Sequence, residues 1–154
     1  MEKLENSLID FDKQFKEINN LKWMPWIGAR YDQTRIVVLG ESQYEDGDDW
    51  QEENIEATRI SISSQFSGKK GKLCTNVERV LLSTENATLN QGNYIWNSVT
   101  YWNLVQRLMT SRDGRPDDSD FDIGWKVFFD IPKLSDQIFA LSLENPAVGD
   151  LAII

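Results

Sequence analysis

Apolar residues recur every three or four positions along the first twenty residues of the chain. Such spacing places side chains on one stripe of an α-helix, and the stripe consists of Leu4, Leu8, Phe11, Phe15 and Ile18. The pattern predicts a helix that ends near Asn19-Asn20. We therefore expect a single domain over residues 1–154, with an N-terminal helix in 1–20 and an α/β core in 21–154.

A second kind of pattern, a continuous apolar run, predicts the strands. Residues 35–40 read Arg-Ile-Val-Val-Leu-Gly, and such β-branched runs suit a strand covered on both faces, as in a parallel sheet. Residues 137–142 and 150–154 predict two further strands. The segment 21–28 packs large apolar side chains around Pro25, so the chain there must be extended or turning.

Helical spacing returns in three places between these strands. A short helix is predicted by Leu73, Val77, Val80 and Leu81. A longer stripe predicts one helix through Ile95, Val99, Trp102, Val105, Leu108 and Met109. A third helix is predicted to begin at Ser119-Asp120 and to bury Phe121, Trp125, Phe128 and Phe129. The order of elements favours an α/β fold of three layers, with a short, mainly parallel sheet flanked by helices.

The amino-acid composition excludes several classes of catalytic and metal site. The 154 residues include no histidine, which excludes Ser-His-Asp and Cys-His catalysis and histidine-ligated metals. The single cysteine, Cys74, cannot form an internal disulfide, so a reducing compartment is the simpler interpretation. No apolar run reaches the length of a membrane span and the N-terminus is unlike a signal peptide. We expect a cytoplasmic protein without membrane contact and without a cofactor.

The charge is unevenly distributed. Acidic residues outnumber basic ones 25 to 16, for a net charge of −9, which repels a polyanion unless the cations are gathered in one place. Residues 41–56 carry eight acidic residues and no basic one. Residues 57–84 carry five basic residues and one acidic residue, Glu78. Lys69, Lys70 and Lys72 form a basic loop that is a candidate nucleic-acid contact, together with Arg59, Arg79, Arg107, Arg112 and Arg115. Ordinary solvation of a surface remains the alternative.

The strongest local signal for chemistry follows the strand at 35–40. Gly40, Glu41, Ser42 and Tyr44 come where a parallel strand ends, which is the edge at which α/β proteins bind ligands. A plain turn with helix-capping side chains is the alternative. A serine nucleophile at Ser42 would lack a histidine base, and a magnesium site on Glu41 with Asp46, Asp48 or Asp49 fits no metal loop of known spacing.

Three stretches of the sequence resemble the uracil-DNA glycosylase superfamily of DNA-repair hydrolases, over roughly residues 21–130. The stretches are Pro25-Trp26-Ile27-Gly28, Leu39-Gly40-Glu41-Ser42 and residues 96–106, Trp-Asn-Ser-Val-Thr-Tyr-Trp-Asn-Leu-Val-Gln. The superfamily's first motif is Gly-Gln-Asp-Pro-Tyr in one branch and Gly-Glu-Ala-Pro-Gly in another. By this resemblance Glu41 would orient the attacking water, Tyr44 would wall the base pocket and Asn103 would read the base.

The chain departs from that superfamily at three points. Ser42 and Gln43 stand where the Gly-Gln-Asp-Pro-Tyr form has aspartate and proline, and the His-Pro-Ser loop that follows the last strand in the family has no counterpart here. The resemblance therefore implies a protein that holds a nucleobase or a nucleotide of DNA in a cleft, with weak or no hydrolysis of the N-glycosidic bond. By this resemblance the chain would be a shortened relative. Separately, the apolar strand predicted at 150–154 and the small number of predicted strands suggest that another chain completes the sheet, so we expect oligomers to form.

A non-enzymatic role is the alternative function. An acidic face over residues 41–56 could bind a basic protein partner or imitate DNA. The net charge and the missing His-Pro-Ser loop favour this interpretation. No measurable DNA binding beside tight binding of a basic partner would support this role, whereas DNA affinity that weakens steeply with salt would support the glycosylase-like one.

Overall fold

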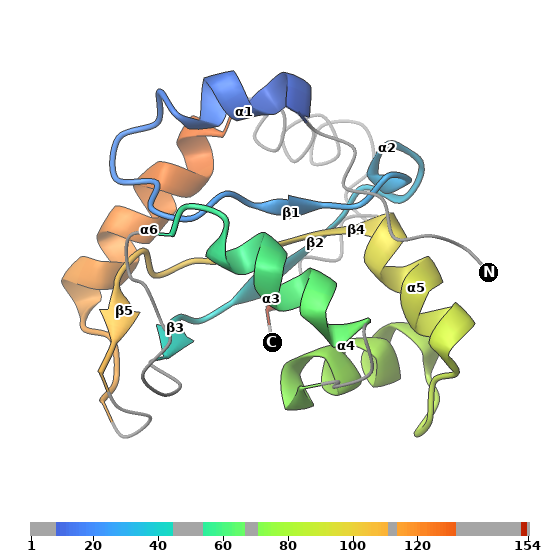
Figure 1. Cartoon of the computed structure of the whole chain (residues 1–154). Helices are drawn as coiled ribbons and strands as arrows, with labels where there is room; N and C mark the ends of the chain where they lie inside the picture. Colours follow the sequence, from blue (N-terminus) through green and yellow to red (C-terminus); the bar gives the residue numbers. More distant parts are fainter. Residues whose placement is uncertain (1–8, 45–53, 67–70, 111–113, 132–151, 154) are drawn as a thin grey trace, which may run out of the picture.

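The computed structural model describes most of the chain, and the fold is built from several short elements (Figure 1). The described residues are 9–44, 54–66, 71–110, 114–131 and 152–153. The helices are α1 (Ile9–Phe15), α2 (Tyr31–Thr34), α3 (Ala57–Gln65), α4 (Lys72–Leu82), α5 (Leu89–Ser98) and α6 (Asp118–Asp130). The strands are β1 (Trp26–Ile27), β2 (Ile36–Gly40), β3 (Gln43–Tyr44), β4 (Val99–Asn103), β5 (Leu108–Met109) and β6 (Ala152–Ile153). Within the described residues, every helix is too short or too polar to cross a membrane.

The main sheet has four strands in the order β1-β4-β2-β6. Strand β2 lies in its middle and pairs in parallel with both β4 and β6, whereas β1 pairs antiparallel with β4. The predicted strand at 35–40 is confirmed as β2, and the predicted terminal strand is present as β6. The strand predicted at 137–142 lies outside the described residues. The protein is thus an α/β protein with a small mixed sheet, as its class was predicted.

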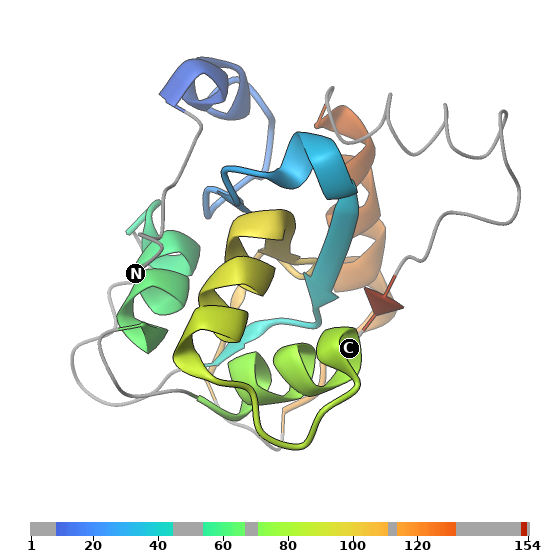
Figure 2. The same ribbon diagram turned by 90° about the vertical axis from the view of Figure 1, so that its right-hand side faces the viewer.

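Alternate residues of β2 reach two separate hydrophobic cores, so both faces of the sheet are covered (Figure 2). On one face, Val37 and Leu39 pack with Phe15 of α1 and with Val127 and Phe128 of α6. On the other face, the core is formed by Trp26, Val38, Ile62, Cys74, Val77, Ile95, Trp96, Val99 and Tyr101, which brings in α3, α4 and α5. A strand buried on both faces explains why the 36–40 run is apolar throughout.

The prediction of one long helix through residues 95–109 is wrong. Helix α5 ends at Ser98, and the chain continues directly as β4, with all five of its residues buried. The run Val99-Thr100-Tyr101-Trp102 is β-branched and aromatic, which favours a strand. Because β4 lies inside the sheet, apolar side chains on it serve both cores and give a spacing that also fits a helix.

Two helix boundaries also differ from their predictions. Helix α1 ends at Phe15, and the following turn places Asn20 in the left-handed region at φ 65°. Helix α6 is capped by Asp117 and not by Ser119: the Asp117 side chain accepts the Asp120 N–H, and the Asp120 side chain accepts the Asp117 N–H. This reciprocal box satisfies two N–H groups that a helix start leaves open.

Candidate functional site

The carboxyl ends of β2 and β4 form a topological switch point. The chain leaves β2 toward α3, α4 and α5 on one face of the sheet, and it leaves β4 toward α6 on the other face. In open α/β sheets, ligands bind outside the carboxyl ends of adjacent strands whose connections part in this way. The residues singled out from the sequence after β2, together with Asn103 at the end of β4, all lie at this edge, which we call the carboxyl edge.

Beyond the sheet, the two departing segments stay together for several residues. The N–H groups of Leu104 and Val105 donate to the carbonyls of Gly40 and Glu41, each at 2.9 Å. Strands β3 and β5 then pair in parallel as a second, two-stranded sheet. The backbone on either side of Glu41 is therefore fixed by ordinary strand hydrogen bonds, and its side chain projects from an ordered edge.

The Glu41 carboxylate receives two donors. Arg115, which precedes α6, places Nη1 at 3.0 Å from Oε2 and 3.3 Å from Oε1. The Tyr44 hydroxyl donates to Oε2 at 3.3 Å. The glutamate is partly exposed and the arginine largely exposed. Glu41 and Tyr44, both predicted site residues, are thus in contact, and the carboxylate remains open to solvent on one side.

Asn103 is buried, and both polar atoms of its side chain are engaged. Its Oδ1 accepts the Tyr101 hydroxyl at 2.7 Å, and its Nδ2 donates to Gln43 Oε1 at 2.9 Å. Burial raises the pKa of Tyr101, so the hydroxyl remains a donor. A Cβ at Gly40 would overlap Asn103 Oδ1 and Tyr101 Oη. Gly40 is therefore required for this close packing. Asn103 could hydrogen-bond a base only by giving up its bond to Tyr101 or to Gln43.

Ser42 contributes a buried oxygen to the same edge. Its Oγ is inaccessible to solvent and has no hydrogen-bond partner among the described residues, as is also true of Trp23 Nε1 and Thr58 Oγ1. A serine without a base to accept its proton is not an activated nucleophile.

The predicted nucleic-acid contacts lie only partly within the described residues, and Arg112 is among those outside them. Lys72 is the exposed first residue of α4, and Lys69 and Lys70 lie outside the described residues. Trp23, Trp26 and Trp96 are buried and are not available to stack on bases. Of the arginines considered from the sequence, Arg115 contacts Glu41 at the carboxyl edge, Arg107 binds Asp120 of α6, and the Arg59 side chain is only 8% exposed.

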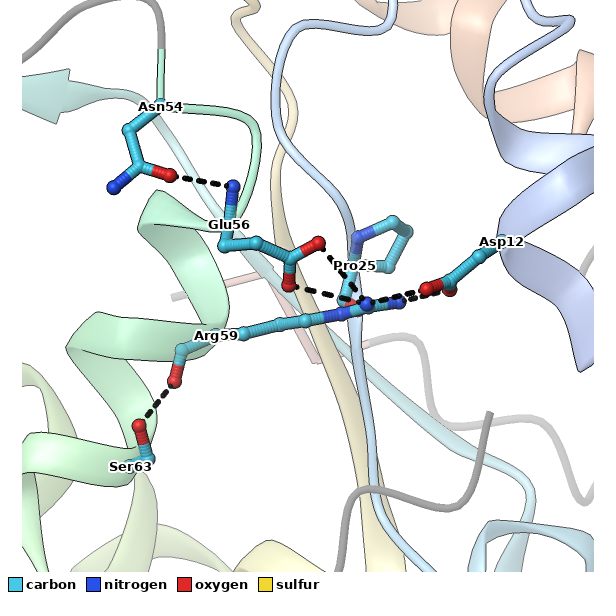
Figure 3. Close-up of polar contacts among 6 residues, drawn as sticks. All are labelled: Asp12, Pro25, Asn54, Glu56, Arg59 and Ser63. Carbon is cyan, nitrogen blue, oxygen red and sulfur yellow. Dashed lines mark hydrogen bonds and ion pairs between the residues drawn. The ribbon is translucent and has the colours of Figure 1, made fainter. Parts of the chain in front are cut away.

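The buried Arg59 is the centre of an ion-pair network whose carboxylate partners, Asp12 and Glu56, are 22% and 42% exposed (Figure 3). Its Nε donates to the Pro25 carbonyl at 3.0 Å, Nη2 lies 2.7 Å from Asp12 Oδ1, and Nη1 lies 3.2 Å from Glu56 Oε2. Burial opposes the charge, but the hydrogen bond to Asp12 and the two carboxylate charges outweigh it, so the pKa of Arg59 is raised. The network ties α1, the segment before β1 and α3 together, which is a structural role.

A shallow hollow lies between the turn before β1, the loop after β4 and the start of α6. Its volume is about 200 Å³, and it is lined by Asn20, Lys22, Gln106, Arg107, Asp120 and Ile123. Arg107 donates to Asp120 Oδ1 and Oδ2 at 2.7 and 2.6 Å, which lowers the pKa of that carboxyl. Sequence reasoning missed Lys22, Gln106 and Asp120 as partners because no local pattern joins positions about 84 residues apart, as in the Lys22–Gln106 bond.

The predicted magnesium site and the predicted acidic surface lie mostly outside the described residues. Among the described residues, no group of three or more cysteine, aspartate or glutamate side chains could hold a metal ion. Asp46, Asp48 and Asp49 lie outside that part of the chain. Of the eight acids in 41–56, Glu41 and Glu56 are described, and each is paired with an arginine. The acidic interaction surface remains a prediction.

The chain was compared with protein-family models, curated proteins and solved structures, and none of them matches it.

Proposed function

We propose that the carboxyl edge holds a nucleobase, in the manner that the resemblance to uracil-DNA glycosylases implies. The observation that carries the proposal is the position of Glu41: a partly exposed carboxylate, oriented by Tyr44 and Arg115, at the switch point beyond the central strand. A glutamate that served only a turn would need neither of these two contacts. The carboxylate would accept an N–H of the base or a water molecule beside it.

The neighbours of Glu41 support an edge that can both accept and donate hydrogen bonds. The carboxylate is an acceptor, while the Arg115 guanidinium is a donor whose Nε and Nη2 bind none of the described residues. Nucleobases present donors and carbonyl acceptors side by side on their Watson–Crick edge, so they match a paired acid and base. Tyr44 adds an aromatic ring on which a planar ligand could stack.

We expect hydrolysis of the N-glycosidic bond to be slow. Glu41 would orient water toward the sugar carbon, while the departing base would need a hydrogen-bond donor to stabilise its negative charge. The chain has no histidine for this task, and the loss of one such donor costs about 10²–10³ in rate. Binding of the base is therefore the primary function proposed, and its release from DNA the secondary one.

The test measures binding and release with one pair of variants. Uracil and deoxyuridine are titrated into ¹⁵N-labelled protein, and base release is followed from uracil-containing single- and double-stranded DNA. Glu41→Gln should abolish the shifts at the carboxyl edge, and Glu85→Gln, at an exposed carboxylate after α4, should keep them. Shifts that are absent in the wild type, or that are equal in both variants, would overturn the proposal.

A further inference from the structure

Two hydrogen bonds lead in one direction from the core under α3, α4 and α5 to the carboxyl edge. The Tyr101 hydroxyl donates to Asn103 Oδ1 at 2.7 Å, and Asn103 Nδ2 donates to Gln43 Oε1 at 2.9 Å. Tyr101 and Asn103 are buried, at 4% and 1% exposure, whereas Gln43 is partly exposed. The series therefore starts inside the protein and ends at a side chain that is partly open to solvent.

Tyr101 fixes the direction of both bonds. A phenol carries one hydrogen, whereas a primary amide has an NH₂ group that donates and an oxygen that accepts. If the Asn103 amide were turned over, its NH₂ group would face the Tyr101 oxygen, and the phenol hydrogen would lose its only acceptor among the described residues. Burial raises the pKa of Tyr101, so this hydrogen stays in place. Buried donors in native proteins are almost always paired, and the Asn103 oxygen therefore faces Tyr101.

The same constraint passes from Asn103 to Gln43. Because Asn103 directs Nδ2 at Gln43, the glutamine must meet it with its acceptor, Oε1. The Nε2 group of Gln43 is then not engaged by Asn103, and it binds none of the described residues. The backbone of Gln43 is held as well, since it pairs with Leu108 of β5. Ordering a glutamine costs side-chain entropy, and here the fold has met this cost before a ligand binds.

The end of the central strand makes room for this arrangement. Asn103 is the register partner of Gly40, the last residue of β2. A Cβ at Gly40 would overlap both Asn103 Oδ1 and Tyr101 Oη, the two atoms of the first hydrogen bond. The bond that sets the direction of the series therefore lies directly against the carboxyl end of β2, and Gln43 lies at the same edge through its contact with Asn103.

We propose that Gln43 Nε2 is the group with which the carboxyl edge recognises a carbonyl oxygen of its ligand. Tyr101 and Asn103 are positioning residues that hold this donor in place without touching the ligand. Nε2 only donates, so its partner must be an acceptor, which a carbonyl of a nucleobase supplies. Recognition thereby passes to Gln43 from Asn103, the residue to which the resemblance assigns it. The proposal rests on the proposed function for the class of ligand, but it needs no simultaneous contact of the base with Glu41.

The first measurement uses the free protein and asks whether the donor is held. In ¹⁵N relaxation of side-chain amides, Gln43 should approach the order parameter of rigid backbone, about 0.85, and Gln33, exposed in α2, should stay below about 0.6. Tyr101→Phe removes the donor that orients Asn103, so the Gln43 value should fall. Equal values for the two glutamines in the wild type, or an unchanged Gln43 value in a folded Tyr101→Phe variant, would overturn the proposal.

The second measurement uses two small rings as probes. Uracil has carbonyl groups, and 2-aminopyrimidine is a ring of the same size with an amino group and no carbonyl. Gln43→Glu keeps an oxygen for Asn103 and replaces Nε2 by an oxygen that cannot donate. Gln33→Glu is the matched control, because it adds the same charge on α2, before the amino end of β2. Titrations followed by ¹⁵N chemical shifts give the affinities.

Gln43→Glu should weaken uracil binding about tenfold, the effect of one lost hydrogen bond to a base, and should not weaken 2-aminopyrimidine. Gln33→Glu should bind uracil as the wild type does. Unchanged uracil affinity in Gln43→Glu, or an equal loss in Gln33→Glu, would overturn recognition by Gln43. Failure of the proposed function has a different signature: Glu41→Gln keeps the uracil affinity of the wild type, while Gln43→Glu loses it.

Discussion

Two arginine–carboxylate pairs in this protein use the same chemistry in opposite surroundings. In the Arg59–Asp12 pair, the side chains are 8% and 22% exposed, and the guanidinium also binds Glu56 and the Pro25 carbonyl. In the Arg115–Glu41 pair, they are 75% and 36% exposed, and a single nitrogen of the arginine makes both contacts. The first pair joins three segments of the chain, and the second bridges the carboxyl edge and the approach to α6.

The difference shows which pair is available for function. A buried ion pair with every neighbour engaged cannot exchange its partners without exposing an unpaired charge, so it holds the fold together. An exposed pair contributes little to stability and can exchange a partner for water or a ligand at small cost. Burial, and not residue type, thus separates the structural arginine from the candidate site. Arg107–Asp120 lies between them, with side chains 46% and 10% exposed.

The largest effect is expected at Arg59. Arg59→Ala leaves Asp12, Glu56 and the Pro25 carbonyl without their shared donor, so the free energy of unfolding should fall by about 3–5 kcal/mol. Urea denaturation followed by tryptophan fluorescence measures it. Arg59→Lys keeps the charge but not the two-pronged geometry and should give an intermediate loss. A loss below about 1 kcal/mol for Arg59→Ala would contradict the structural role.

A smaller, pH-dependent effect is expected at Asp120. The hydrogen bond from Arg107 lowers the pKa of Asp120, so its stabilising contribution is complete above the unfolded pKa of about 3.9 and is lost as pH falls through the folded value. Asp120→Asn should cost about 1 kcal/mol at pH 7, because it weakens the helix box and the ion pair. The difference between wild type and variant should shrink below about pH 4.

Denaturation midpoints of both proteins between pH 7 and pH 3 test this prediction. Asp118→Asn, on the same turn of α6 and exposed, is the matched control and should retain the acid dependence of the wild type. A gap between wild type and Asp120→Asn that stays constant down to pH 3 would show that the carboxylate charge plays no part.

The sequence predicts the elements whose signals are local. The run Ile36–Gly40 is apolar throughout because both faces of β2 are covered, and this pattern locates the strand and the polar residues after it. Glu41 and Tyr44 were both predicted at this edge, and the hydrogen bond between them is seen only in the structure. The α6 helix is likewise predicted by its apolar stripe, although its cap lies at Asp117. The prediction that Phe129 is buried is wrong: this side chain is 51% exposed, while Phe128 is buried in the core.

Tertiary contacts account for what the sequence did not reveal. Arg59 belongs to a basic stretch, but its partner Asp12 is 47 residues away, so its burial has no local signal. Strand β4 carries apolar residues for two cores, and their spacing imitates a helix. The hollow is lined from three distant segments, and no pattern within any one of them indicates that they meet.

The smallest effect is expected at the exposed pair, and it sharpens the comparison most directly. A double-mutant cycle with Glu41→Gln and Arg115→Gln should give a coupling of about 0.2–1 kcal/mol, the range for exposed ion pairs. Since the Debye length falls to about 3 Å at 1 M salt, the coupling should be largely lost there. Urea denaturation of the four proteins at low and high salt measures it. A coupling above about 2 kcal/mol that persists in 1 M salt would place Glu41 and Arg115 with the structural network of Arg59, and the carboxylate would then not be free to exchange its partner for a base.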